Sequence, residues 1–171
     1  MVFENIELPI TDLPDFKTVN LNGVEKSYKK IIWINTALIF LLLFAAPIVF
    51  LILDFLPIWI PITVLTIVSV IFTFQAIEIE KGFPRKKFGI RQHDIIYQNG
   101  YFYFKEIVVP FNRIQHVEVK QGPLSRIFKL YALKLYTAGA SSGDLVINGL
   151  SKDNAQKLKS KVLAKTSDID E

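Results

Sequence analysis

Two long uncharged stretches follow one another near the start of the chain, and they constrain its fold more than any other feature. The first covers residues 31–53 and the second residues 55–77, with only Asp54 between them. As a helix, either stretch would be about 35 Å long, which exceeds the roughly 30 Å hydrocarbon core of a bilayer. Because a backbone in lipid must satisfy its hydrogen bonds within the segment, we expect both stretches to be helical. The sequence therefore predicts a two-helix transmembrane hairpin.

Positive residues lie on the outer sides of this hairpin. Lys26, Lys29 and Lys30 precede the first stretch, five more Lys or Arg residues occur between positions 81 and 91, and the turn between the stretches has none. Lys and Arg near the ends of membrane spans are retained in the cytoplasm. We therefore expect a two-pass protein with both termini on the cytoplasmic side.

The rest of the chain has the composition of a soluble, basic protein. From Glu78 onward there are 16 Lys or Arg against 10 Asp or Glu, whereas the first 77 residues have 4 against 6. A basic domain beside a bilayer is attracted to anionic headgroups. The chain has no cysteine, which excludes disulfides, thiolate chemistry and cysteine-based metal sites.

Short strands and turns follow the hairpin. Asn99-Gly100 is the strongest short signal for a β-hairpin, and residues 101–104, all Tyr or Phe, are predicted to form the returning strand. Residues 138–143 are predicted to form a loop of small residues. We expect four parts: an N-terminal cytoplasmic arm (1–30), the transmembrane hairpin (31–77), a β-rich domain (78–165) and a polar tail (166–171).

An amphipathic helix is predicted near the C-terminus. Ser151 is a good N-cap and Asp153 lies in the first turn, where negative charge is favoured. Ala155, Leu158 and Val162 then recur at helical spacing. A single apolar stripe of this kind needs a β surface to cover.

Several short motifs of the domain carry a resemblance to a known family. They are Arg113-Ile114, Gln121-Gly122, Thr137-Ala138-Gly139 and Ile147-Asn148-Gly149-Leu150, in that order. With the paired apolar stretches before them, they resemble the bacterial pleckstrin-homology (PH) domain of the membrane-flanked, YdbS-like type, over about residues 31–163. One departure is Phe128-Lys129-Leu130, where the family often has Phe-Gly-Leu.

The resemblance implies an α+β membrane protein of the bacterial plasma (inner) membrane. Its transmembrane hairpin would be followed by a PH-like antiparallel β-barrel that the C-terminal helix caps. It also implies a link to envelope stress or to resistance against membrane-active peptides.

Basic and aromatic side chains form the candidate surface for lipid or partner binding. A plainer reading is that the cluster at 85–87 only fixes the topology and that the other cations are solvated strand ends. The candidate residues are Arg85, Lys86, Lys87, Arg91, Arg113, Lys120, Arg126, Lys129, Tyr101 and Tyr103.

The function expected first is a binding and assembly module at the inner leaflet, which engages another membrane protein or a second copy of the chain. Recognition of anionic lipid headgroups is one alternative, and a role as an accessory transporter subunit is another. His93 and His116 are isolated, and no P-loop or nucleophile motif is present. We therefore expect no enzyme activity, cofactor or metal, and no binding of nucleic acid.

Overall fold

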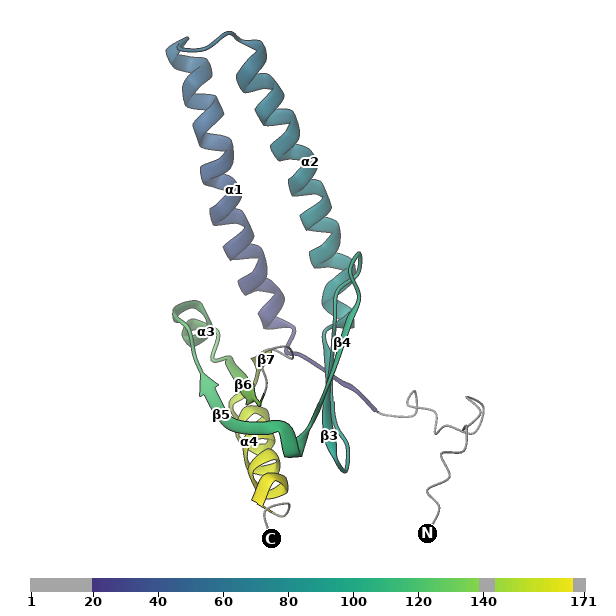
Figure 1. Ribbon diagram of the computed structural model, residues 1–171. Coiled ribbons are helices and arrows are strands. Elements are labelled where there is room, and N and C mark those ends of the chain that lie inside the picture. Colours follow the sequence, from purple (N-terminus) through teal and green to yellow (C-terminus); the bar gives the residue numbers. More distant parts are fainter. Residues whose placement is uncertain (1–19, 139–143, 168–171) are drawn as a thin grey trace, which may run out of the picture.

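The computed structural model describes residues 20–138 and 144–167. A two-residue strand precedes two long helices, and the other strands of two antiparallel sheets and a C-terminal helix follow (Figure 1). In chain order the elements are β1 (Asn22–Gly23), α1 (Ser27–Leu53), α2 (Trp59–Gly82), η3 (Phe83–Arg85), β2 (Lys87–Ile90), β3 (Asp94–Asn99), β4 (Lys105–Pro110), η4 (Phe111–Arg113), β5 (Ile114–Lys120), α3 (Pro123–Ile127), β6 (Tyr131–Thr137), β7 (Leu145–Leu150) and α4 (Lys152–Ser167).

The two long helices coincide with the uncharged stretches and pack side by side as a hairpin (Figure 1). Asp54 ends α1 in the left-handed conformation (φ 49°). The second helix begins at Trp59, four residues after the start of its uncharged stretch, because residues 55–58 complete the turn. Phe40 packs edge-on against Phe72 from the other helix, with ring centroids 4.9 Å apart.

Both helices are long and apolar enough to cross a membrane. At 1.5 Å per residue they measure about 40 Å and 36 Å. In the most apolar 18-residue window of each helix, only 17% and 6% of the residues are buried. The core helix of a soluble protein would be mostly buried, so another environment must cover these side chains.

The strands form two separate antiparallel sheets. One has the order β1-β2-β3-β4 and the other the order β5-β6-β7. The prediction of a β-barrel is therefore confirmed only as far as its antiparallel strands, since no ladder among the described strands joins the two sheets into a closed barrel. The chain instead turns from one sheet to the other through η4, where the fully buried Phe111 fills the joint.

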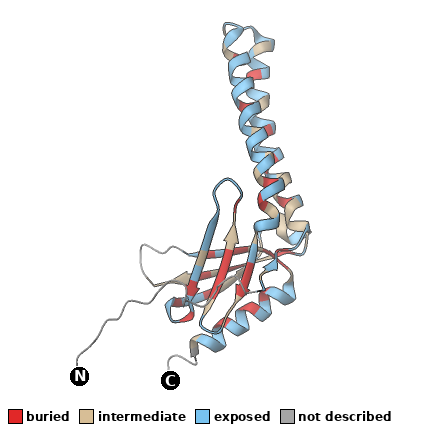
Figure 2. Ribbon diagram, turned by 90° about the vertical axis from the view of Figure 1, so that its right-hand side faces the viewer, coloured by how far each residue is buried: buried red, intermediate tan, exposed pale blue. Residues whose placement is uncertain are grey.

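The domain core lies between the sheets and under α4. Ile95 and Leu133, one from each sheet, are completely buried. The C-terminal helix contacts β5 and β6 and buries the predicted stripe Ala155, Leu158 and Val162 (Figure 2). Its N-terminus is capped as predicted, because the amide of Asn154 donates to the Ser151 hydroxyl at 3.3 Å.

The predicted strand over residues 101–104 is wrong. Asn99 and Lys105 form the last pair of the β3–β4 ladder, so the residues between them belong to neither strand. The four aromatic residues instead form the loop at the tip of the β3–β4 hairpin. Tertiary contact with α2 holds the backbone of this loop and overrides the strand propensity of its residues. The small-residue loop predicted at 138–143 lies outside the described residues, except for Ala138.

Candidate membrane-facing site

The aromatic loop (residues 101–104) is held against the end of α2 by one carboxylate. Glu78 accepts hydrogen bonds from the amide of Tyr101 at 2.9 Å and from the amide of Phe102 at 2.9 Å. The Phe102 ring lies 5.7 Å from that of Phe74, one helical turn earlier on α2. The loop therefore lies beside the last apolar turns of the hairpin (Figure 1).

A second carboxylate on α2 holds the two long helices together at the same level. Glu80 accepts a hydrogen bond from Lys29 Nζ at 2.7 Å and one from Trp33 Nε1 at 3.2 Å, both from α1. Residues two apart on a helix lie about 200° apart around its axis. Glu78 and Glu80 consequently face in opposite directions, one toward the aromatic loop and the other toward α1.

Gly82 allows the loop to come this close. A Cβ at position 82 would lie 2.6 Å from a carboxylate oxygen of Glu78 and 3.4 Å from the amide nitrogen of Tyr101. Any larger residue would therefore push the carboxylate away from the loop amides. Gly82 is buried between Glu78 and the aromatic loop, and its lack of a side chain is what lets the two approach each other.

The side chains of the aromatic loop are open to their surroundings. Tyr103 is 81% exposed, and Phe102 and Phe104 are each more than half exposed. The guanidinium of Arg85 lies over the Tyr101 ring at 4.7 Å from its centroid, a cation–π contact. The loop thus combines exposed aromatic rings with an adjacent positive charge.

The short helix α3 forms a second exposed apolar lobe, beside α1 (Figure 1). Ile127 at its end is 73% exposed, although it is a large aliphatic residue. Arg126 and Lys129 flank Ile127 and are also exposed. Together the aromatic loop and α3 border the base of the hairpin, and we call this region the hairpin-side end of the domain.

The strand directions assign each predicted site residue to one end of the domain. Because β2 runs away from the hairpin and each later strand reverses direction, the chain returns to the hairpin-side end after β3, β5 and β7. Eight of the candidate residues lie in segments at that end, namely Arg85, Lys86, Lys87, Tyr101, Tyr103, Lys120, Arg126 and Lys129. Arg91, in the β2–β3 turn, and Arg113, in η4, lie at the opposite end.

Several of these cations have partners within the chain. Lys86 donates to the side-chain oxygen of Asn99, and burial lowers the pKa of its ammonium, although the charge of Glu78 opposes this effect. Lys120 pairs with Glu118 at 3.0 Å, and this hydrogen bond raises the pKa of Lys120. Arg91 makes a two-pronged contact with Asp94, at 2.7 and 2.6 Å. Each of these three cations therefore already contacts a partner within the chain.

Glu78 and Glu80 are the residues of this site that sequence reasoning missed. Their signal was their position, since two carboxylates directly follow an uncharged stretch and are separated by a single residue. Such a spacing indicates two partners on opposite faces of a helix. Among the described residues, no three His, Cys, Asp or Glu side chains lie close enough together to hold a metal ion.

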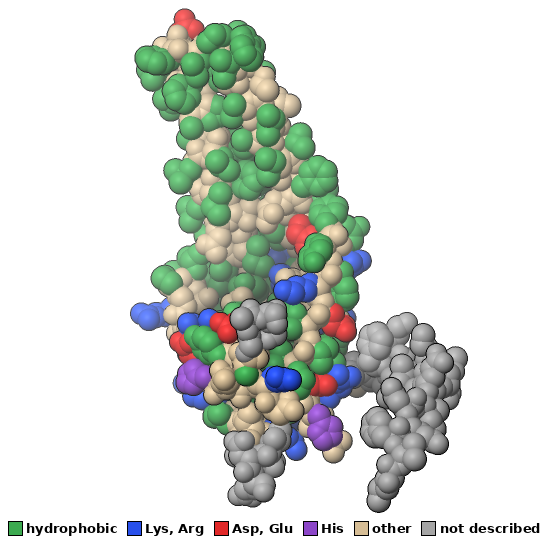
Figure 3. Space-filling model, in the orientation of Figure 1, with side chains coloured by type: hydrophobic (Ala, Val, Ile, Leu, Met, Phe, Trp, Pro, Cys, Tyr) green, Lys and Arg blue, Asp and Glu red, His purple; other side chains and the backbone are tan. Residues whose placement is uncertain are grey.

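Figure 3 shows how side-chain types are distributed over one face. Hydrophobic side chains cover the hairpin, and the Lys and Arg side chains gather on the domain below it. The exposed apolar residues of the aromatic loop and α3 adjoin this boundary. The arrangement matches a surface that meets a bilayer, where aromatic rings and cations favour the interface.

Comparison with known proteins agrees with this architecture. The family model described as a bacterial PH domain matches residues 8–166. The UPF0699 transmembrane protein YdbS of Bacillus subtilis (strain 168) is 31% identical over 86 residues, which are 49% of this chain and 52% of the relative. The match thus spans about half the length of this curated relative. No solved structure matches the chain.

The family match and the similarity to a transmembrane protein both agree with a PH-like module associated with a membrane. The two apolar helices give that association its structural basis. The chain belongs to the bacterial PH domain family.

Proposed function

We propose that the protein crosses the bacterial inner membrane twice, with both termini in the cytoplasm, and that its PH-like domain recognises anionic lipid headgroups at the inner leaflet. The observation that carries the proposal is the hairpin-side end of the domain. There, exposed aromatic and aliphatic side chains lie beside the last turns of two apolar helices. The hairpin would fix the domain at the membrane surface in one orientation.

The chemistry of the surface supports contact with lipid. Tyr103 and Ile127 would enter the interfacial layer, where apolar side chains leave water and aromatic rings are favoured. Arg126 and Lys129 are exposed beside Ile127. Each cation near an anionic membrane surface contributes roughly 1 kcal/mol. The half-buried Lys86 is bonded to Asn99 and supports the loop instead.

Depth-dependent quenching in nanodiscs tests this placement on the full chain. Because the protein has no cysteine, a fluorophore can be attached at Tyr103→Cys or Ile127→Cys alone. We expect lipids that carry a quencher at the headgroup to quench both probes. A probe at Gln92→Cys, in the exposed turn at the far end of the domain, is the control and should escape quenching. Equal quenching at all three positions, or none at Tyr103→Cys and Ile127→Cys, would contradict the proposal.

The requirement for anionic lipid is tested by charge neutralisation. Quenching at Ile127→Cys should be stronger in anionic than in zwitterionic nanodiscs, and this difference should fall when Arg126→Gln and Lys129→Gln are combined. Arg113→Gln, at the opposite end of the domain, is the matched control and should leave the difference unchanged. If the two lipids gave the same quenching, headgroup recognition would be wrong even though the placement stood.

Engagement of another membrane protein or of a second copy remains a prediction, as do the roles in transport and envelope stress and the absence of enzyme activity. Lipid contact is preferred because the exposed residues of the hairpin-side end adjoin the two apolar helices. That adjacency requires no component beyond the bilayer itself.

A further inference from the structure

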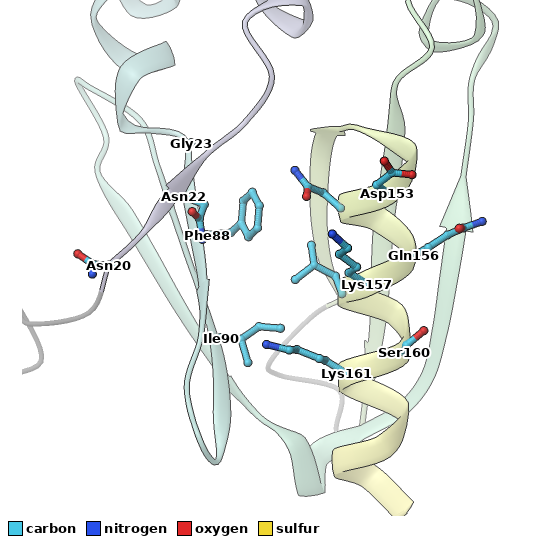
Figure 4. Close-up of a pocket in the computed structure, with 12 residues that line it drawn as sticks. Asn20, Asn22, Gly23, Phe88, Ile90, Asp153, Gln156, Lys157, Ser160 and Lys161 are labelled. Atoms are coloured by element: carbon cyan, nitrogen blue, oxygen red, sulfur yellow. The ribbon is translucent and has the colours of Figure 1, made fainter.

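An open groove of about 860 Å³ lies in the domain between the β1–β2 edge and α4 (Figure 4). Asp153, Lys157 and Lys161 all line it, so its charges have both signs. Its apolar residues Phe88 and Leu158 are almost fully buried in the core. Water can reach and satisfy the polar side chains of such an open groove. A polar side chain on a membrane-crossing helix is in a different position, because hydrocarbon offers it no hydrogen bond.

Two amide side chains on the long helices have no partner within the chain. Asn35 lies in the first uncharged stretch and Gln75 in the second. Both are exposed, and neither has a hydrogen-bond partner among the described residues. By contrast, the Ser and Thr hydroxyls at positions 63, 66, 69 and 73 of α2 each donate to the carbonyl four residues earlier. In a bilayer the two amides therefore require an acceptor from outside the chain.

The two amides lie at the same height on the hairpin. The antiparallel helices touch at the Lys29–Glu80 ion pair and again where Phe40 packs against Phe72. On each helix, one of the two amides lies about midway between these contacts. A single ligand at that height can therefore meet both amides.

Both amides lie on the side of the hairpin that faces the domain. Tyr28, Ile31 and Asn35 are spaced by three and four residues, so they share one face of α1, and the base of that helix contacts β7 and α3. Gln75 is three residues before Glu78, whose carboxylate binds the aromatic loop. Figure 2 shows the domain on one side of the hairpin base. We call these five residues the domain-side face of the hairpin.

This side of the molecule changes in character with distance from the domain. The exposed cations Arg126 and Lys129 of α3 lie at its base, and the two amides come next. Closer to the hairpin turn, Leu38 and Leu42 of α1 continue the face of the first amide, and Ile71 of α2 continues that of the second. All three aliphatic side chains are more than half exposed. A phospholipid has the matching order of phosphate, ester carbonyls and acyl chains.

We propose that a phospholipid binds against the domain-side face, with Asn35 and Gln75 donating hydrogen bonds to the ester carbonyl oxygens of its acyl chains and with its headgroup beside α3. The inference rests on the proposed membrane crossing, and it adds a defined lipid site to the proposed headgroup recognition. A transmembrane helix from a partner or from a second copy fits this face poorly, because the domain blocks the path of such a helix just beyond the amides. A lipid molecule ends at that height.

Retention of lipid by the unaltered full chain tests the proposal. The protein is released from nanodiscs that contain phosphatidylglycerol with either ester-linked or ether-linked chains, and native mass spectrometry counts the lipid that stays bound. The two lipids have the same headgroup charge, but the ether linkage has no carbonyl acceptor. We expect about fivefold greater retention of the ester lipid, the change that corresponds to the loss of about one hydrogen bond. Equal retention would overturn this site, whereas headgroup recognition would stand if quenching at Ile127→Cys still required anionic lipid.

Isosteric apolar substitutions identify the donors. Asn35→Leu and Gln75→Met keep the size of each side chain without its amide, and the double variant should retain the two lipids equally. Thr66→Val is the matched control and should keep the ester preference, because the Thr66 hydroxyl already donates to the carbonyl of Ile62. A double variant that still preferred the ester lipid would refute the assignment of these donors. Recovery of the unaltered protein as a dimer that Asn35→Leu dissociates would show that a second copy, and not lipid, satisfies the amides.

Discussion

Lys129 has a backbone conformation that its side chain does not favour. Its φ is 53°, in the left-handed region, at the residue that follows the C-cap of α3. The amide of Lys129 donates to the carbonyl of Arg126, and that of Leu130 donates to the carbonyl of Ser125 at 2.7 Å. These bonds end the helix as a glycine-type cap would. The position is the one at which the resembled family often has glycine, so the turn is kept with a less suitable residue.

Replacing this residue is expected to stabilise the protein. Lys129→Gly removes the steric cost of a left-handed backbone, and we expect the free energy of unfolding to rise by about 0.5–1 kcal/mol. Thermal unfolding in detergent micelles, followed by circular dichroism, measures the change. Lys105→Gly, at an exposed strand position, is the control with the opposite sign, because glycine weakens a strand. A lower unfolding midpoint for Lys129→Gly would refute this explanation.

At the level of elements, the β3–β4 hairpin and the end of α2 form one unit. The carboxylate of Glu78 accepts bonds from consecutive amides of the aromatic loop, and Gly82 leaves the space for this contact. The loop thus obtains its backbone partners from a helix and not from a facing strand. Hydrogen bonds to a charged acceptor are stronger than those to a neutral one, so the Glu78 carboxylate is well suited to hold two consecutive amides of the loop.

Glu78→Gln should release the aromatic loop. The neutral amide offers one acceptor oxygen in place of two charged ones, so the amides of Tyr101 and Phe102 should exchange with solvent roughly tenfold faster. Hydrogen exchange of the full chain in nanodiscs measures this rate. Glu80→Gln, two residues away and facing α1, should leave the loop amides unaffected. Unchanged protection of the loop in Glu78→Gln would show that side-chain packing holds it.

Sequence patterns predicted the elements well and their contacts poorly. The uncharged stretches and the stripe on α4 depend on local periodicity, which a single sequence displays. The strand predicted at 101–104 failed because Glu78, more than twenty residues earlier in the chain, binds the loop backbone. The division into two sheets likewise depends on the bend at Phe111, a long-range packing choice.

At the scale of the whole molecule, the helical hairpin and the domain are joined at their shared base. The amide of Glu25 donates to the carbonyl of Gly149 at 2.8 Å, just before α1 begins. Gly149 has a φ of 77°, and a Cβ there would lie within 2.6 Å of Tyr28 side-chain carbons from the first turn of α1. The first long helix and the sheet therefore meet in direct contact at this residue.

Substitution at Gly149 should weaken this junction. Gly149→Ala combines a strained backbone with a clash against Tyr28, and we expect a loss of about 2–4 kcal/mol in the free energy of unfolding. Denaturant unfolding in detergent measures the loss. Gly122→Ala is the control, because nothing lies within 4 Å of its Cβ position and its φ is −77°. If the two variants were equally stable, the contact between Gly149 and Tyr28 would not contribute to the stability of the fold.

The opposed carboxylates of α2 have a mechanical consequence. Glu78 and Glu80 bind partners on opposite sides of α2, so a rotation of α2 about its long axis would break at least one of these two contacts. A tilt of α2 together with α1 and the aromatic loop would leave both contacts intact. If the hairpin spans a bilayer as proposed, we expect it to adapt to a thinner or thicker bilayer by tilting and not by rotation of α2, and the domain would change its angle to the membrane surface together with the helices.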